Sequence, residues 1–470
     1  MASKKPHAIM VSFHLQGHIV PFVNLAIKLA SKGFSITFAH LEFVHQQISQ
    51  SQNSTQTDIF AAARTSGLDI RYTTLSDGFP LDFDRSANFN EWVAYYRDRF
   101  PEKVDELVGQ IVQSDSSSNY FLVADTFCVW PEKIAKKYGL VNASFWTEPA
   151  LVFSLYYHLD LLREKGHVPV NGRREMVDYV PGIYSINTKD FMSYLHDTEF
   201  EALHETIFRA FDAVKSADFV LCNTVEELEP DTISALHQKQ PFYAIGPLFS
   251  SDFAVPNSLL SQVSSADWLN SKPPGSVLYV SFGSLATTDK SVILEIAGGL
   301  LLSQVNFIWV VRPGMVDSGG GGVMPEGFED MTRKRGLVVP WCSQNEVLRN
   351  PAIGGFLTHC GWNSILESVW CGVPMVCYPL FTDQITNRKL VVDDWRVGVN
   401  MCEGEHINKE EVAEKIEFVM NEKRSAELRK EIEKVRCTLE KAVTVNGSSD
   451  RNFDGFVEQV CHQISRRCSE

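Results

Sequence analysis

The 470-residue sequence predicts an α/β protein with two doubly wound parallel sheets in tandem. Two observations carry this prediction. Short apolar strands alternate with helical segments in both halves of the chain, and a stretch rich in proline and serine separates the halves. Such alternation is typical of a parallel sheet with helices on both faces. At about 100–200 residues per domain, the length also suits two domains.

The first half of the chain holds the first alternating series. The expected strands are 7–13, 35–40, 69–75, 120–126, 143–147, 217–224 and 242–248. A helix is expected over 19–33, with Pro21 in its first turn and Gly33 at its end, because proline suits a helix start and glycine a helix stop. A polar helix is expected near 43–52.

The second half repeats this pattern. The expected strands are 276–284, 306–312, 336–341, 354–359 and 374–379, and the expected helices lie near 289–303, 408–421 and 424–442. The glycine run 318–322 is followed by "VMPEGF" and not by a helix. Because a phosphate-binding loop needs a helix N-terminus behind it, we interpret this run as a surface loop.

Composition and charge exclude several classes of protein. Lys and Arg number 43 and Asp and Glu number 58, for a net charge of −15. This balance disfavours nucleic acid and anionic membranes as partners, since both need a basic surface. No apolar stretch approaches the roughly 18 residues of a membrane helix or resembles a signal peptide. The ten cysteines form no CxxC pair, which is typical of reduced thiols. We therefore expect a cytoplasmic protein.

The stretch "GGFLTHCGWNSILES", residues 354–368, predicts a strand that turns sharply into a helix. Polar and aromatic side chains crowd this corner: His359, Trp362, Asn363, Ser364 and Glu367. Unpaired N–H groups at a helix start favour an anion. Glu367 would repel a phosphate and suits ribose hydroxyls, while Trp341 can stack on a base. The set predicts a nucleoside diphosphate site.

The segment Trp341–Gln384, "WCSQNEVLRNPAIGGFLTHCGWNSILESVWCGVPMVCYPLFTDQ", resembles the 44-residue signature of plant small-molecule UDP-glycosyltransferases. The segments "QGHIVP", "VSFGS" and "YAIGPL" fit this family at their expected places, so the resemblance covers nearly the whole chain. It implies the GT-B fold, in which two Rossmann-like domains face each other across a cleft. The implied parts are an acceptor-binding domain over 1–245, a linker over 246–262, a UDP-sugar-binding domain over 263–450, and a helical tail over 451–470 that packs back toward the first domain.

The resemblance also implies roles for individual residues. The implied UDP-binding residues are Ser284, Trp341, Cys342, Gln344, His359, Asn363, Ser364 and Glu367. Within this set Trp341 stacks on uracil, the backbone of Cys342 bonds the edge of the base, and Gln344 and Glu367 hold the ribose. The implied sugar-binding residues are Thr147, Trp362, Asp383 and Gln384. A final glutamine in the signature tends to accompany glucose, so Gln384 favours UDP-glucose. Ser343 and Ile365 replace the usual proline and threonine, and neither side chain is an implied ligand.

His18 and Asp125 are the candidate catalytic pair. His18 follows the first strand and Asp125 closes the strand "FLVAD", so both are expected at the same edge of the sheet. A histidine beside a carboxylate can accept a hydroxyl proton while the carboxylate fixes its tautomer. Position alone also allows a capping or packing role, but the family places its base and acid partner here. His14 is a candidate acceptor contact alongside His18, with simple packing as the alternative.

The predicted reaction is inverting transfer of glucose from UDP-glucose to a hydroxyl of a small apolar acceptor, giving a β-glucoside and UDP. Flavonoids, terpenoids and phenolics all suit the site. No metal is expected, and the UDP-sugar is a co-substrate and not a cofactor. The open alternatives are another UDP-sugar or a catalytically silent ligand-binding protein of the same fold. A nicotinamide oxidoreductase would need GxGxxG after the first strand, and a serine hydrolase would need GxSxG. We expect a monomer.

Overall fold

The computed structural model describes residues 5–51, 58–85, 87–115, 118–196, 201–249, 262–316, 324–404 and 406–467. The chain divides into two compact units. Unit 1 comprises Met1–Lys189, Tyr194–Leu259 and Lys441–Glu470, and unit 2 comprises Asp190–Ser193 and Leu260–Glu440. The chain returns to unit 1 at Lys441, whereas the limit expected from the sequence is 450. Most of the expected linker, and the glycine run 318–322, lie outside the described residues. The domain limits drawn from the sequence stay a prediction.

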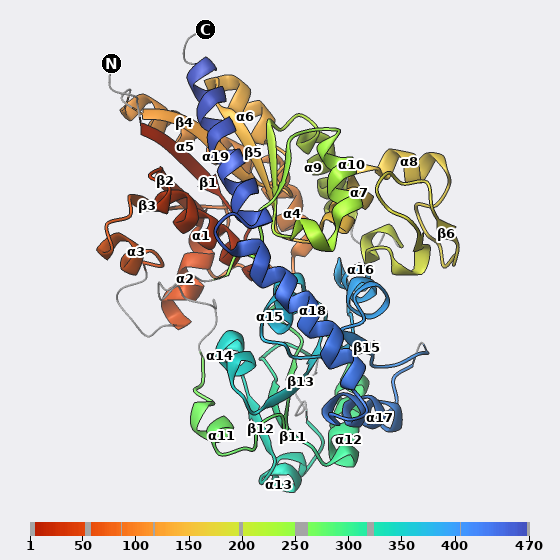
Figure 1. Cartoon of the computed structure of the whole chain (residues 1–470). Helices are drawn as coiled ribbons and strands as arrows, with labels where there is room; N and C mark the ends of the chain where they lie inside the picture. The colour runs from red at the N-terminus through yellow and green to blue at the C-terminus, as the bar shows by residue number, and fades with distance from the viewer. Residues whose placement is uncertain are drawn as a thin grey trace. The chain divides into compact units, whose positions relative to one another are not determined.

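Unit 1 is built on a seven-stranded parallel sheet in the order β3-β2-β1-β4-β5-β8-β9 (Figure 1). The strands are β1 (Lys5–Val11), β2 (Ser35–Leu41), β3 (Ile70–Leu75), β4 (Ser118–Asp125), β5 (Val141–Trp146), β8 (Phe219–Cys222) and β9 (Phe242–Ala244). β2 and β5 are buried at every position, as strands covered on both faces must be. The parallel sheet predicted for the first half is confirmed.

Helices cover this sheet and supply its connections. They are α1 (Gln16–Ser31), α2 (Glu42–Ser51), α3 (Ala61–Thr65), α4 (Phe89–Asp98), α5 (Phe100–Ser114), α6 (Pro131–Tyr138), α7 (Ala150–Tyr157), α8 (Leu159–Glu164), α9 (Glu201–Val214), α10 (Pro230–His237) and α19 (Ser448–Arg467). The short elements of this part of the chain are the hairpin β6 (Met176–Val177) and β7 (Ile186–Asn187), with the 3-10 turns η1 (Thr188–Asp190), η2 (Ser193–Leu195) and η3 (Glu226–Leu228). Asp190 at the end of η1 and Ser193 at the start of η2 belong to unit 2.

The start of α1 differs from the prediction. The helix begins at Gln16, because the carbonyl of Leu15 accepts hydrogen bonds from the N–H groups of His18 and Ile19. Pro21 therefore lies inside the helix and not in its first turn. The earlier start places His18 in the first turn of α1, which follows β1 after the short connection 12–15.

The final helix α19 belongs to unit 1. It runs across β4, β5 and β9 (Figure 1), and Phe453 and Phe456 enter the core of the unit. The ammonium group of Lys28 lies 4.4 Å from the ring centroid of Phe453. Apolar burial and this cation–π contact hold the end of the chain against the sheet.

Unit 2 is built on a six-stranded parallel sheet in the order β12-β11-β10-β13-β14-β15. The strands are β10 (Val277–Ser281), β11 (Asn306–Val310), β12 (Gly336–Val339), β13 (Ile353–Thr358), β14 (Met375–Cys377) and β15 (Gly398–Asn400). The second predicted parallel sheet is thus confirmed. β15 was not expected, because three residues are too few to show a pattern.

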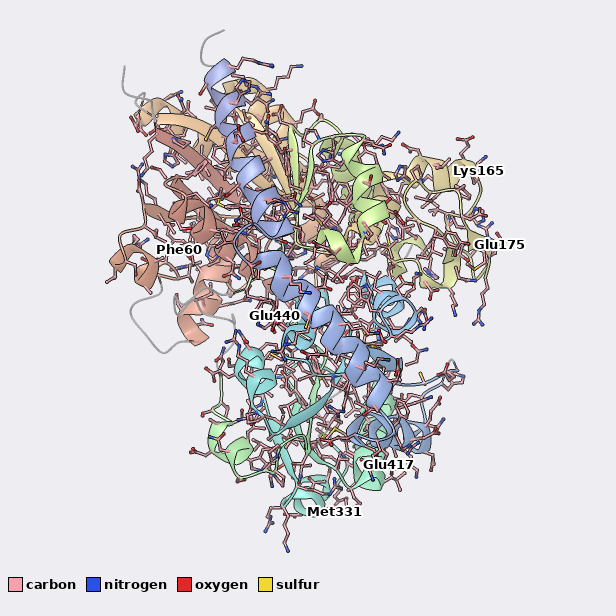
Figure 2. The ribbon with its side chains drawn as sticks, in the orientation of Figure 1. Phe60, Lys165, Glu175, Met331, Glu417 and Glu440 are labelled. Atoms are coloured by element: carbon pink, nitrogen blue, oxygen red, sulfur yellow. The ribbon has the colours of Figure 1, made fainter. Side chains whose placement is uncertain are left out.

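The helical elements of unit 2 follow the same alternation. They are α11 (Ala266–Asn270), α12 (Lys290–Ser303), α13 (Phe328–Thr332), α14 (Gln344–Arg349), α15 (Trp362–Trp370), α16 (Gln384–Lys389), the π-helical turn η4 (Leu390–Asp394), α17 (Lys409–Met420) and α18 (Ala426–Val443), which ends in unit 1. Leu278, Trp309, Leu357 and Val376 from the strands fill the core. By contrast, Met331 on α13 is exposed and points outward (Figure 2).

A buried carboxylate supports the start of α7. Glu229, which is only 6% exposed, accepts hydrogen bonds from the N–H groups of Ala150 (3.1 Å) and Leu151 (2.7 Å). The hydroxyl of Thr224 also donates to it. The first N–H groups of a helix have no partner within the helix, and Pro149 at the N-cap provides none. Glu229 therefore caps α7 from a distant part of the chain.

We expect Glu229→Ala to lower the free energy of unfolding by about 2 kcal/mol, because two buried amide donors lose their acceptor. Urea denaturation of the wild type and the variant measures this difference. The exposed Glu226 lies on the same segment, and Glu226→Ala should change stability by less than about 0.5 kcal/mol. Equal losses in the two variants would contradict the capping role.

Candidate active site

The carboxyl ends of three adjacent strands of unit 1 bring together His18, Asp125 and Thr147. β1 pairs with β4, and β4 pairs with β5, so their ends lie at one edge of the sheet. Nδ1 of His18 lies 2.8 Å from Oδ2 of Asp125, and Oγ1 of Thr147 lies 3.2 Å from the same Nδ1. His18 is 6% exposed and Asp125 is 1% exposed. The two residues predicted as a pair are thus in direct contact.

The hydrogen bonds around Asp125 determine how His18 presents its ring. Oδ1 of Asp125 accepts a hydrogen bond from the N–H of Phe127 at 3.0 Å, which leaves Oδ2 for the imidazole. A carboxylate is only an acceptor, so Nδ1 of His18 donates to it, and Nε2 is the nitrogen that has a free lone pair whenever the ring is neutral. A histidine in this state can accept a proton from a hydroxyl group.

His14 lies among aromatic rings close to this pair. Its ring centroid is 4.2 Å from that of Phe13 and 4.3 Å from that of Trp92. Burial lowers the pKa of His14 well below its usual value, and the nearby His18 and Arg85 lower it further. Nδ1 of His14 has no hydrogen-bond partner among the described residues. His14 is therefore a neutral polar group in apolar surroundings, and both interpretations of it stay open.

Sequence reasoning missed the residue that holds Trp92 in place. The buried carboxylate of Asp77 accepts from Nε1 of Trp92 at 2.8 Å and from Nε and Nη2 of Arg85 at 2.7 and 3.0 Å. The guanidinium of Arg85 in turn lies 4.1 Å from the ring centroid of Phe43. These contacts order a segment that has no regular pattern in the sequence.

In unit 2 the ends of β10 and β13 enclose His359. A Cβ atom at either Gly283 or Gly361 would lie 2.5 Å from Nε2 of His359, so a side chain at either position would displace this ring. Gly283 also has a φ of +75°, which other residues rarely adopt. Burial lowers the pKa of His359 to about 4, opposed by a hydrogen bond with the backbone of Ser281. The imidazole of His359 is thus neutral. Ser284 directly follows Gly283, shortly after the end of β10.

Gln344 joins two predicted residues of α15. Its amide nitrogen donates to Oγ of Ser364 at 2.9 Å and to Oε2 of Glu367 at 2.8 Å. The hydroxyl of Tyr279 donates to Oε1 of Gln344 at 3.4 Å. Burial raises the pKa of Glu367 to about 7, while the hydrogen bond from Gln344 and the charge of Arg349 oppose the shift. Tyr279 was not expected, because it lies on an apolar strand.

Trp341 and Cys342 follow β12 at the same edge of the sheet. Both are buried, and Nε1 of Trp341 is without a hydrogen-bond partner in the described part of the chain. Burial raises the pKa of Cys342 to about 11, so its side chain is a neutral thiol. Asn363 lies in the first turn of α15, and the buried indole of Trp362 packs against Trp395 with ring centroids 5.9 Å apart.

Asp383 and Gln384 lie at the start of α16, where hydrogen bonds hold both side chains. Oε1 of Gln384 accepts from the N–H groups of Leu380 (2.9 Å) and Phe381 (3.2 Å). The two carboxylate oxygens of Asp383 accept from the hydroxyl of Thr382 and from Nδ2 of Asn387. That nitrogen of Asn387 also donates to the carbonyl of Cys360 at 3.0 Å, which connects this turn to the corner at His359.

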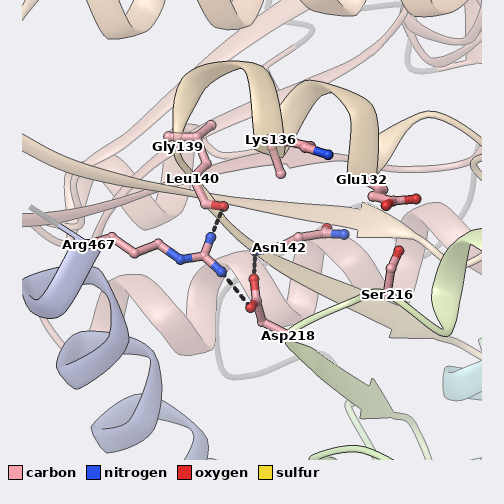
Figure 3. A pocket seen from close by; sticks show the side chains of 9 residues that line it. Glu132, Lys136, Gly139, Leu140, Asn142, Ser216, Asp218 and Arg467 are labelled. Carbon is pink, nitrogen blue, oxygen red and sulfur yellow. Dashed lines mark hydrogen bonds and ion pairs between the residues drawn. The ribbon is translucent and has the colours of Figure 1, made fainter. Parts of the chain in front are cut away.

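A hollow of about 410 Å³ lies elsewhere on unit 1, and no predicted site residue lines it (Figure 3). Asp218 at its wall accepts hydrogen bonds from the N–H of Asn142 and from Arg467, which also donates to the carbonyl of Leu140. Asn142 and Asp218 lie near the beginnings of β5 and β8, at the edge opposite His18. These bonds anchor the end of α19.

The remaining predictions concern metals, membranes and thiols. Among the described residues, no group of three or more His, Cys, Asp or Glu side chains is placed to hold a metal ion. No described helix is long and apolar enough to cross a membrane. Each described cysteine is a free thiol. Metal independence, cytoplasmic location and the monomeric state stay predictions.

The raised pKa of Glu367 predicts that the free energy of unfolding depends on pH. Its pKa of about 7 in the folded protein lies above the ordinary value of 4.5, so its contribution is full below about pH 4.5 and is lost as pH rises through about 7. Glu367→Gln removes this titration, and its stability relative to the wild type should rise by on the order of 1 kcal/mol between about pH 5 and pH 8. Thermal unfolding at the two pH values measures the change. Glu346→Gln, at an exposed site on α14, is the control, and a pH-independent difference for Glu367→Gln would contradict the assignment.

Comparisons with known proteins extend over the whole chain. The family described as UDP-glucoronosyl and UDP-glucosyl transferase matches residues 249–432. UDP-glycosyltransferase 86A1 of Arabidopsis thaliana is 53% identical, over 99% of this chain and 96% of that protein. Gallate 1-beta-glucosyltransferase 84A23 of Punica granatum is 33% identical, over 97% of this chain and 90% of its own.

Solved structures agree with these relatives. The structure of Os79 from O. sativa in complex with UDP has a TM-score of 0.82 and 26% identity, and the match covers 98% of this chain and 100% of that one. A UDP-glucosyltransferase from Polygonum tinctorium has a TM-score of 0.79 and 28% identity, and the match covers 99% of this chain and 100% of that one. The chain therefore belongs to the plant UDP-glycosyltransferase family, with its GT-B fold, as its signature segment predicted.

Proposed function

We propose that this UDP-glycosyltransferase transfers glucose from UDP-glucose to a hydroxyl group of a small, largely apolar acceptor, with inversion at the anomeric carbon. The observation that carries the proposal is the buried contact of 2.8 Å between His18 and Asp125. It leaves Nε2 of His18 ready to accept a proton, in a chain whose family is established.

The reaction is a single displacement. Nε2 of His18 takes the proton of the acceptor hydroxyl, and the acceptor oxygen forms a bond to the anomeric carbon. The bond from that carbon to the phosphate oxygen breaks at the same time, and UDP leaves with the electron pair. Asp125 stabilises the imidazolium that forms, and the proton then passes to solvent. The attack comes from the face opposite UDP, so an α-linked donor gives a β-glucoside.

The donor is held by side chains of unit 2 in this proposal. Trp341 stacks on uracil, the backbone of Cys342 bonds its edge, and Gln344 and Glu367 bind the ribose. The diphosphate contacts are assigned to Ser284, His359, Asn363 and Ser364. Support comes from the neutral ring of His359 and from the N–H groups at the start of α15, where the helix dipole favours an anion.

The sugar contacts are assigned to Thr147, Trp362, Asp383 and Gln384. Oε1 of Gln384 is occupied by two backbone N–H groups, so its amide nitrogen is the atom that can donate to a sugar hydroxyl. Glucose is favoured because glutamine ends the signature segment and because two relatives are named as glucosyltransferases.

The acceptor is proposed to be a phenolic or terpenoid alcohol, or a flavonoid. The rings of Phe13 and Phe127 each lie 5.4 Å from the His18 ring, which suits an apolar molecule, and neutral His14 can bond a second polar group on it. One relative is named for gallate and another for 7-deoxyloganetin. Transfer from another UDP-sugar and ligand binding without catalysis are the alternatives.

UDP release from a panel of UDP-sugars, with mixed phenol and terpenol acceptors, tests the proposal. We expect release from UDP-glucose that requires an acceptor. Release from a different UDP-sugar alone would contradict the choice of donor. UDP binding without turnover on any acceptor would favour the silent alternative.

His18→Ala should lower kcat by about 100-fold or more, because the base is lost, while the Kd of UDP stays unchanged. Asp125→Asn should also slow transfer strongly, because the amide can donate to Nδ1 and so favour the wrong tautomer. His167→Ala is the matched control, since His167 is a partly buried histidine of unit 1 that bonds Tyr179. Wild-type turnover in His18→Ala would refute its role as base.

A further inference from the structure

A short segment from the first half of the chain belongs to unit 2. Residues Asp190–Ser193 are part of unit 2, whereas the chain on both sides of them belongs to unit 1. The sequence around this segment shows no regular strand or helix pattern. Its contacts are with α16 and with the turn that precedes this helix.

Ser193 and Thr382 form a reciprocal pair of hydrogen bonds. The N–H of Ser193 donates to the carbonyl of Thr382 at 3.1 Å, and the N–H of Thr382 donates to Oγ of Ser193 at 2.8 Å. Thr382 has a φ of +60°, a left-handed conformation that is unfavourable for a β-branched residue. The two bonds from Ser193 satisfy the backbone of Thr382 in this conformation.

Asp190 anchors the other end of the segment. Its carboxylate pairs with the guanidinium of Arg388, which also bonds Asp393 at 3.1 Å. The carbonyl of Asp190 accepts the hydroxyl of Thr386 at 2.7 Å. Asp190, Thr386 and Arg388 are all buried, so the segment is fixed along α16 and Ser193 has little freedom to move away from Thr382.

The turn that Ser193 holds carries the two residues assigned to the donor sugar. The hydroxyl of Thr382 donates to Oδ1 of Asp383 at 2.6 Å, so the conformation of Thr382 orients that carboxylate. Gln384 follows directly and bonds back to the N–H groups of Leu380 and Phe381 in the same turn. A change in the conformation of Thr382 would therefore alter the positions of the side chains of Asp383 and Gln384.

We propose that Ser193 is a positioning residue for donor-sugar recognition, which holds Thr382 in its left-handed conformation and thereby orients Asp383 and Gln384. The inference rests on the proposed function, in which these two residues contact the sugar. It assigns part of the donor selectivity to a residue outside the signature segment, and it separates recognition of the sugar from recognition of UDP.

The test compares ligand binding with donor preference. Ser193→Ala should weaken binding of UDP-glucose about five-fold, as expected for loss of a hydrogen bond, and leave the Kd of UDP unchanged. The preference for UDP-glucose over UDP-galactose, measured as a ratio of kcat/KM, should fall by a similar factor. Ser193→Thr keeps the hydroxyl and should restore both values. Ser185→Ala, on the preceding loop, is the control.

A double-mutant cycle tests the link to Thr382. Asparagine adopts the left-handed conformation more readily than threonine, and its side-chain N–H can replace the hydroxyl bond to Asp383. Ser193→Ala should therefore cost less in a Thr382→Asn background than alone. Equal weakening of UDP and UDP-glucose by Ser193→Ala, or no weakening of either, would overturn the inference.

The same data distinguish failure of the role given to Ser193 from failure of the proposed function. If the wild type shows no preference for UDP-glucose but Ser193→Ala still weakens UDP-sugars and not UDP, the choice of glucose is wrong and the role of Ser193 stands. If substitution of Asp383 or Gln384 leaves the affinity of the wild type for UDP-sugars unchanged, the sugar contacts are wrong, and the inference falls with them.

Discussion

The buried hydrogen bond between Asp125 and His18 is the contact on which the chemistry of unit 1 depends. A carboxylate that is 1% exposed is unfavourable unless its oxygens are hydrogen-bonded, and the N–H of Phe127 and the ring of His18 satisfy both. The pairing of β1 with β4, which sets Val11 beside Ala124, brings the two residues to adjacent strand ends. The fold of the sheet thus determines which nitrogen of His18 holds the proton.

In unit 2 the predicted site also lies at the carboxyl ends of the strands, but it meets a different requirement. It must hold the neutral ring of His359 close to the backbone at Gly283 and Gly361. Glycines on both sides of His359 allow this approach, and Gln344 holds the polar groups of α15 in position. Burial raises the pKa of Glu367 to about 7 even though Gln344 donates a hydrogen bond to it, so its charge is costly in the folded protein, and a bound ligand rich in hydroxyl groups can offset that cost.

Much of this organisation could be predicted from the sequence, because it follows local patterns. Alternating strands and helices predicted both sheets, and the rule that parallel strands share an edge predicted that His18 and Asp125 meet. The signature segment identified the family through one continuous stretch of chain. The start of α1 was wrong, because a proline inside a helix is an exception that the local pattern does not show.

The contacts that escaped prediction join residues far apart in the sequence. Glu229 caps a helix 79 residues before it, and Ser193 bonds a residue 189 positions after it. Neither residue has a distinctive neighbourhood, since an acidic or hydroxyl side chain in a loop is common at any surface. Asp77 bonds residues only 8 and 15 positions away, and it escaped because an acidic side chain in an irregular segment is not distinctive. Such contacts depend on how the segments fold together, which a single sequence does not reveal.

The anomeric configuration of the product tests the central claim most directly. In the proposed mechanism His18 activates the acceptor for one displacement at the anomeric carbon. Proton NMR of the glucoside formed from UDP-glucose should therefore show a β-linkage in the first product to accumulate. An α-linkage would mean retention of configuration, and it would contradict both the single displacement and the role given to the His18–Asp125 pair.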